Sequence, residues 1–111
     1  MIRVAQRKKT KVKMIITGPA GAGKTYTALN IAHGLVGDWD KIGVICSEWQ
    51  DDDNTAADLY SDMGPFKIYE MKPPYMPERF VNAYHELVQT GVEVVIIDSI
   101  SDEASFLEML D

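Results

Sequence analysis

Short apolar runs alternate along the chain with stretches that repeat apolar residues at helical spacing. Continuous apolar runs of about four to eight residues are typical of buried strands, and spacings of three and four residues are typical of amphipathic helices. The pattern predicts strands over 14–17, 41–46, 66–69 and 92–98, and helices over 25–36, 55–63 and 77–90. Strands that alternate with helices in this way predict an α/β fold, with a parallel sheet flanked by helices.

The predicted helices also specify faces and ends. In the first helix, we expect the apolar side chains to face the core and Gly37 to cap the end; these side chains are Ala28, Leu29, Ala32, Leu35 and Val36. Pro77 suits the first position of the last helix, whose apolar face comprises Phe80, Val81, Tyr84, Leu87 and Val88. The acidic run 51–54 lacks the glycine and terminal glutamate of a calcium-binding loop, so it predicts a turn and N-cap before the helix 55–63.

The segment between the first strand and the first helix matches the phosphate-loop pattern G-x-x-x-x-G-K-[ST] at every fixed position. Its glycines let successive backbone N–H groups turn inward around a phosphate, and the helix N-terminus that follows also favours an anion. Lys24 would reach the β- and γ-phosphates, and the Thr25 hydroxyl would ligate Mg²⁺. We therefore predict a site for ATP and Mg²⁺ formed by Gly18, Pro19, Ala20, Gly21, Ala22, Gly23, Lys24, Thr25 and Tyr26.

Two acidic residues follow the ends of predicted strands, where functional groups collect in open α/β sheets. Asp98 ends the predicted strand 92–98 after four apolar residues, which is the Walker B pattern, and is predicted to be a second magnesium ligand beside Thr25. Glu48 follows the strand 41–46 and is a candidate general base. A capping role for Asp98 and a solvated loop position for Glu48 stay open. Cys46 is expected to be a small buried hydrophobe rather than a reactive thiol.

The length, charge and cysteine content of the chain limit its domain number and its cellular location. The 111 residues predict one domain, and the net charge of −6 conceals a basic leader, residues 1–13, that holds six of the eleven Lys and Arg residues. This leader can contact nucleic acid, although a solvated terminus is the favoured interpretation. A single cysteine excludes an internal disulfide. With no signal sequence and no long apolar run, we expect a cytoplasmic protein that does not contact a membrane.

Four segments together resemble the RecA-like branch of P-loop ATPases, and more closely the phage-encoded nucleotide-binding or AAA-family ATPases. They are residues 18–25, 44–48, 73–80 and 96–101. The resemblance implies that Glu48 polarises the attacking water and acts in catalysis with Lys24. It also implies ATP hydrolysis in phage DNA recombination or replication inside the host cytoplasm. The implied partners are single-stranded DNA, DNA-binding recombination proteins or further copies of the chain.

The sequence departs from this family in three places. Cys46 stands where the family usually has an acid, and the residues 102–104 replace a more typical His-Glu-Trp. RecA-like folds continue beyond Walker B with a strand that inserts between the phosphate-loop and Walker B strands, whereas this chain ends at Asp111. We therefore expect residues 14–111 to be the N-terminal part of a RecA-like core. Its strands 14–17 and 94–98 should then pair directly in a four-stranded sheet.

Two other functions stay open. A non-hydrolysing nucleotide-binding remnant, or an interaction module, fits a chain that lacks the inserted strand. A small-molecule kinase shares the phosphate loop, but phosphoryl transfer generally needs several cationic side chains over the donor. After residue 13 the chain has one arginine, Arg79, which we expect to be solvated and outside the site.

Overall fold

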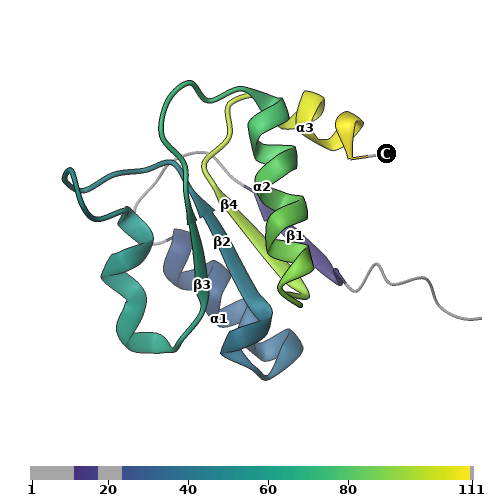
Figure 1. Cartoon of the computed structure of the whole chain (residues 1–111). Coiled ribbons are helices and arrows are strands. Elements are labelled where there is room, and N and C mark those ends of the chain that lie inside the picture. Colours follow the sequence, from purple (N-terminus) through teal and green to yellow (C-terminus); the bar gives the residue numbers. More distant parts are fainter. Residues whose placement is uncertain (1–11, 18–23, 111) are drawn as a thin grey trace, which may run out of the picture.

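A sheet of four parallel strands forms the centre of the molecule in the computed structural model, which describes residues 12–17 and 24–110 (Figure 1). The strands are β1 (Met14–Thr17), β2 (Ile42–Cys46), β3 (Lys67–Glu70) and β4 (Val94–Asp98). Their order across the sheet is β1-β4-β2-β3, and every pairing is parallel. The predicted α/β class is confirmed.

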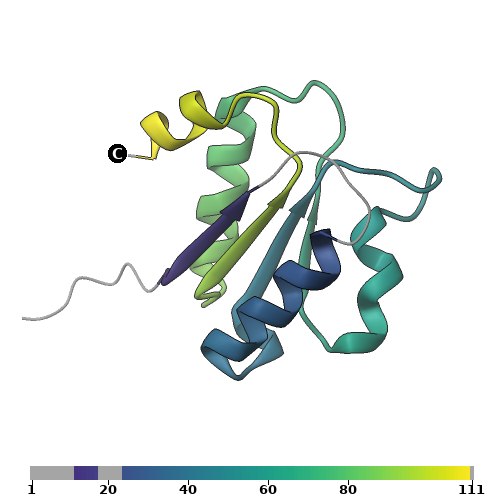
Figure 2. The ribbon, with the colours of Figure 1, turned by 180° about the vertical axis from the view of Figure 1, so that it is seen from behind.

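Helices cover both faces of this sheet. They are α1 (Lys24–Val36), α2 (Pro77–Gln89) and α3 (Glu103–Met109), with shorter 3-10 helices η1 (Trp39–Lys41) and η2 (Ala56–Met63). The helices α2 and α3 lie on one face, and α1 and η2 lie on the other (Figures 1 and 2). The face of β1 beside α1 carries no helix in the described part of the chain (Figure 2).

The period of two along each strand assigns its side chains to these faces. On β4, Val94 and Ile96 pack in the cluster beneath α1, whereas Val95 and Ile97 pack in the cluster beneath α2 and α3. The α2 side contains the largest fully buried side chains of the core, Phe80 and Phe106. All five residues of β4 are buried and the first four are apolar, as is typical of a strand in a parallel sheet covered on both faces.

The edge strand β1 pairs directly with β4, as expected. Met14 lies opposite Val94, and Thr17 lies opposite Ile97. This pairing satisfies the backbone groups on one side of β1, so a four-stranded sheet closes without another strand between the two.

One core prediction for α1 is wrong. Ala28, Leu29 and Ala32 are buried, but Leu35 is 44% exposed. Ile31, one turn earlier, is also exposed. Ile31 and Leu35 are four residues apart and therefore lie on one face of α1. The helix packs on β4 and β2 through another face, so these two side chains stay outside the buried cluster.

The segment 51–63 forms the expected turn and helix with different details. The Asp51 carboxylate accepts hydrogen bonds from the backbone N–H groups of Asp53 and Asn54, and these bonds lower the pKa of Asp51. The helix that follows has 3-10 rather than α geometry. Its N-cap is Thr55, whose N–H donates to Asp58, so the acidic run supplies the turn but not the cap.

The helix α3 was not predicted from the sequence. The Asp102 carboxylate caps it by accepting a hydrogen bond from the N–H of Ser105. Phe106 then fills the core against the Tyr84 ring of α2, with ring centroids 6.3 Å apart. No helix within residues 24–110 is long and apolar enough to cross a membrane.

Candidate functional site

The carboxyl ends of the four strands lie along one side of the sheet, which we call its carboxyl edge. At one point on this side, the segments that follow neighbouring strands lead to opposite faces of the sheet. The chain leaves β1 toward α1 and leaves β2 toward η2, on one face. It leaves β4, which lies between them, toward α3 on the other face. In open α/β sheets, such a divergence opens a crevice beyond the strand ends, and this is where ligands bind.

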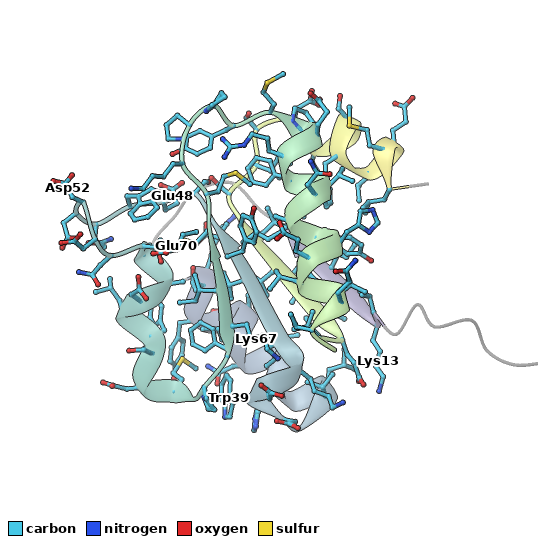
Figure 3. The ribbon with its side chains drawn as sticks, viewed as in Figure 1. Lys13, Trp39, Glu48, Asp52, Lys67 and Glu70 are labelled. Atoms are coloured by element: carbon cyan, nitrogen blue, oxygen red, sulfur yellow. The ribbon has the colours of Figure 1, made fainter. Side chains whose placement is uncertain are left out.

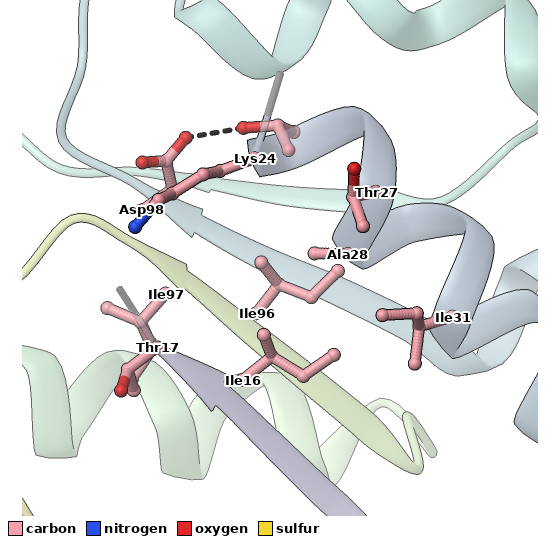
Figure 4. A pocket seen from close by; sticks show the side chains of 10 residues that line it. Ile16, Thr17, Lys24, Thr27, Ala28, Ile31, Ile96, Ile97 and Asp98 are labelled. Carbon is pink, nitrogen blue, oxygen red and sulfur yellow. Dashed lines mark hydrogen bonds between the residues drawn. The ribbon is translucent and has the colours of Figure 1, made fainter. Parts of the chain in front are cut away.

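Asp98 and Thr25 meet at this edge. The period of two places Asp98 on the α1 face, with Val94 and Ile96. Thr25, in the first turn of α1, donates its hydroxyl hydrogen to Oδ2 of Asp98 at 2.5 Å (Figure 4). Both residues are buried. The last residue of the predicted phosphate loop and the last residue of the predicted Walker B strand are therefore in direct contact.

Lys24 lines a pocket beside this pair. The pocket has a volume of about 290 Å³ and lies between α1, β1 and β4 (Figure 4). Apolar side chains, among them Ile16, Ile31 and Ile96, make up much of its lining, and Lys24 and Asp98 are its charged residues. Within the described residues, Lys24 forms no ion pair. Among these residues, no carboxylate therefore neutralises the ammonium group, which belongs to the first residue of α1, where the helix dipole favours an anion.

Glu48 is fixed to the segment that follows Asp98. The Ser99 hydroxyl donates a hydrogen bond to Oε1 of Glu48 at 2.9 Å. The backbone N–H of Ser47 donates to the Asp98 carbonyl, also at 2.9 Å. Glu48 is half-buried and lies at the carboxyl end of the sheet (Figure 3). The structure therefore brings Glu48, Asp98 and Thr25 to one edge.

Arg79 differs from its prediction. Its guanidinium group donates to the carbonyl oxygens of Lys72 and Pro74, each at 2.5 Å. These bonds tie the start of α2 to the loop that precedes it. Arg79 therefore stabilises the conformation of this loop and is not fully solvated.

Cys46 behaves as the predicted buried hydrophobe. It is fully buried in the cluster beneath α1. Burial raises the pKa of its thiol, so the reactive thiolate form is disfavoured. The burial and the raised pKa of Cys46 both fit a structural role in the core.

The oxygen groups at the strand tips fit a magnesium ion. Thr25 offers a hydroxyl and Asp98 a carboxylate, and both are the hard oxygen ligands that Mg²⁺ prefers. Residues 12–17 and 24–110 contain no cluster of three or more His, Cys, Asp or Glu side chains suited to a metal. Such a cluster is not needed, since Mg²⁺ is usually held by one or two protein ligands together with phosphates and water.

Several predicted site residues are not tested by this geometry. Gly18, Pro19, Ala20, Gly21, Ala22 and Gly23 lie outside the described residues. Tyr26 is exposed, and its ring lies near that of Tyr60 at a centroid distance of 6.3 Å. Ser47 and Ser99 were not predicted to belong to the site, although each is a small polar residue directly after a buried strand. This position after a strand end could have identified them as candidate site residues.

Comparisons with known proteins returned no match: no family model, no curated protein and no solved structure resembles the chain closely enough to identify a relative.

Proposed function

We propose that the chain binds ATP with Mg²⁺ at the carboxyl edge of its sheet and hydrolyses it, as a RecA-like P-loop ATPase core. The observation that carries this proposal is the hydrogen bond between Thr25 and Asp98. The Thr25 hydroxyl ends a phosphate-loop pattern, and the Asp98 carboxylate ends a Walker B pattern. These two patterns lie more than 70 residues apart in the sequence, and a chance pair of motifs would have no reason to meet.

Each residue then has a role that its position allows. Thr25 and Asp98 would hold Mg²⁺, which when bound supplies positive charge against the phosphate oxygens. Lys24 compensates the charge of the β- and γ-phosphates from the start of α1. Glu48 accepts a proton from the attacking water, whose oxygen forms a bond to the γ-phosphorus. The bond from the γ-phosphorus to the bridging oxygen breaks, and ADP leaves with its electron pair.

Phosphate release and calorimetry on the wild type and Lys24→Ala test this proposal. The variant should weaken ATP binding by tenfold or more, at least about 1.4 kcal/mol, since the polyphosphate loses a charge-assisted contact. Lys67→Ala is the matched control, because Lys67 pairs with Asp40 at the opposite edge of the sheet. Equal affinity for wild type and Lys24→Ala would contradict the assignment of a phosphate loop.

The same assay separates the alternatives. Binding without phosphate release would support a nucleotide-binding module that does not hydrolyse ATP. The role in phage DNA recombination or replication rests on the family resemblance and on the basic leader 1–13. Phosphate release measured with and without single-stranded DNA tests that role directly, because a DNA-coupled ATPase should turn over faster when DNA is present.

A further inference from the structure

Two serines join the tips of β2 and β4. The Ser47 hydroxyl donates to the Ser99 carbonyl at 2.9 Å and accepts from the Ser99 N–H at 3.1 Å. The Ser47 N–H donates to the Asp98 carbonyl at 2.9 Å. One hydroxyl can donate and accept at once. The backbone of Ser99 is therefore fixed relative to both strand tips.

The Ser99 side chain passes this order on to Glu48. Its hydroxyl donates to Oε1 of Glu48 at 2.9 Å, and both residues are half-buried. A glutamate side chain has several rotatable bonds, so its carboxylate samples many positions unless a partner holds it. A hydrogen bond to an ionised carboxylate is stronger than a neutral one. The bond engages one oxygen of Glu48 and leaves the other oxygen able to accept a proton.

We infer that Ser99 is a positioning residue, which holds the Glu48 carboxylate where it can accept the proton of the attacking water, and that Ser47 supports it. The inference rests on the proposed ATP hydrolysis. Ser99 does not contact the reacting atoms; it restricts Glu48 to a productive orientation. Correct orientation of a reacting group lowers the barrier without tightening the binding of the substrate. Ser99 should therefore affect kcat and leave the nucleotide affinity almost unchanged.

Steady-state phosphate release on Ser99→Ala, with ATP affinity measured in parallel, tests the inference. Loss of this charge-assisted hydrogen bond should lower kcat about tenfold and change the affinity for ATP by less than about twofold. Ser99→Thr keeps the hydroxyl and should restore most of the activity. Ser101→Ala is the matched control, because Ser101 is exposed and forms no side-chain hydrogen bond within the described residues. On a Glu48→Gln background, Ser99→Ala should cause no further loss.

A second readout does not depend on turnover. In the protein without nucleotide, the NMR resonance of the Glu48 carboxyl carbon should move in Ser99→Ala and return in Ser99→Thr. If Ser99→Ala proves too unstable to assay, Ser47→Ala is the alternative. It removes the hydrogen bonds to the Ser99 backbone but keeps the Ser99 hydroxyl, and it should slow turnover several-fold at unchanged ATP affinity.

The two proposals fail differently. Normal kcat in Ser99→Ala, together with a slow Glu48→Gln variant, would overturn the inference and leave the proposed function standing. A purely structural serine would lower stability and leave kcat unchanged in the folded fraction, and that result also overturns the inference. ATP binding without hydrolysis by the wild type would overturn the proposed hydrolysis, and the positioning role with it.

Discussion

The two edges of the sheet use polar residues differently. At the carboxyl edge, the polar groups of Thr25, Glu48 and Asp98 are buried or half-buried and held by hydrogen bonds from other segments. At the amino edge, where the strands begin, Glu93 pairs with Lys13 and Lys41, whose side chains are about half-exposed. Figure 3 shows Glu48 and Glu70 at one end, and Trp39, Lys67 and Lys13 at the other.

We infer from this difference that the carboxyl edge serves the activity and that the amino edge serves the stability of the fold. Buried polar groups are costly unless paired, so their concentration at the carboxyl edge indicates a function that rewards the cost. The amino edge is instead closed by packing, where the His33 ring stacks on Trp39 at 4.3 Å. Substitutions at the carboxyl edge should change activity more than stability, and those at the amino edge should change stability more than activity.

The largest expected effect is that of Glu48→Gln on hydrolysis. The amide cannot accept the proton of the attacking water, so turnover should fall roughly a hundredfold while ATP still binds. Single-turnover phosphate release measures this effect. Glu70→Gln is the matched control, because Glu70 is an exposed carboxylate at the end of β3 on the same edge. Lost ATP binding in Glu48→Gln would indicate a structural role, and unchanged turnover would return Glu48 to a solvated loop position.

Much of this architecture could be predicted from the sequence, because apolar periodicity determines both element type and face. The tip of β4 is an example: alternation from Val94 places Asp98 on the α1 face. The exposure of Leu35 could not be predicted in this way, since helical spacing shows that a stripe is apolar but not how far the sheet extends beneath it. The contact between Ser99 and Glu48 joins residues 51 apart in sequence, and it depends on the strand order.

A second prediction sharpens the comparison from the amino edge. A Cβ at Gly64 would overlap the Trp39 ring, which is rigid and stacked on His33. Gly64→Ala should therefore lower the free energy of unfolding by about 1–3 kcal/mol through overpacking. Urea unfolding followed by Trp fluorescence measures the change. Gly34→Ala is the matched control: its Cβ meets nothing within 4 Å, so the helix α1 should gain stability.

The ATP affinity of the same variant tests whether the amino edge serves stability alone. If folded Gly64→Ala lost ATP affinity at a temperature well below its unfolding transition, the amino edge would be coupled to the site. We expect the affinity to stay within about twofold of the wild type, since the Trp39 cluster and the Thr25–Asp98 pair lie at opposite ends of the strands.

The smallest expected effect is that of Glu93→Gln on stability. Burial acts to raise the pKa of Glu93, but hydrogen bonds and charges from Lys13 and Lys41 outweigh it and lower the pKa. Because the folded state favours the ionised form, these ion pairs stabilise the protein fully above the ordinary glutamate pKa of about 4.3. Their contribution falls as the pH drops through the lowered native value, where Glu93 becomes protonated. Urea midpoints of wild type and Glu93→Gln should therefore differ at neutral pH and converge once the pH falls below the lowered native pKa of Glu93.

Salt provides an independent check on the origin of this small difference. The Lys13 and Lys41 ammonium groups lie 3.4 Å from the Glu93 carboxylate oxygens and are accessible to solvent. At about 1 M salt the screening length is roughly 3 Å, so the neutral-pH difference between the two proteins should shrink there as well. Glu70→Gln, which removes an exposed carboxylate at the other edge, should show neither dependence. A difference that persisted in acid and in high salt would mean that the Glu93 side chain stabilises this edge by packing rather than by its charge.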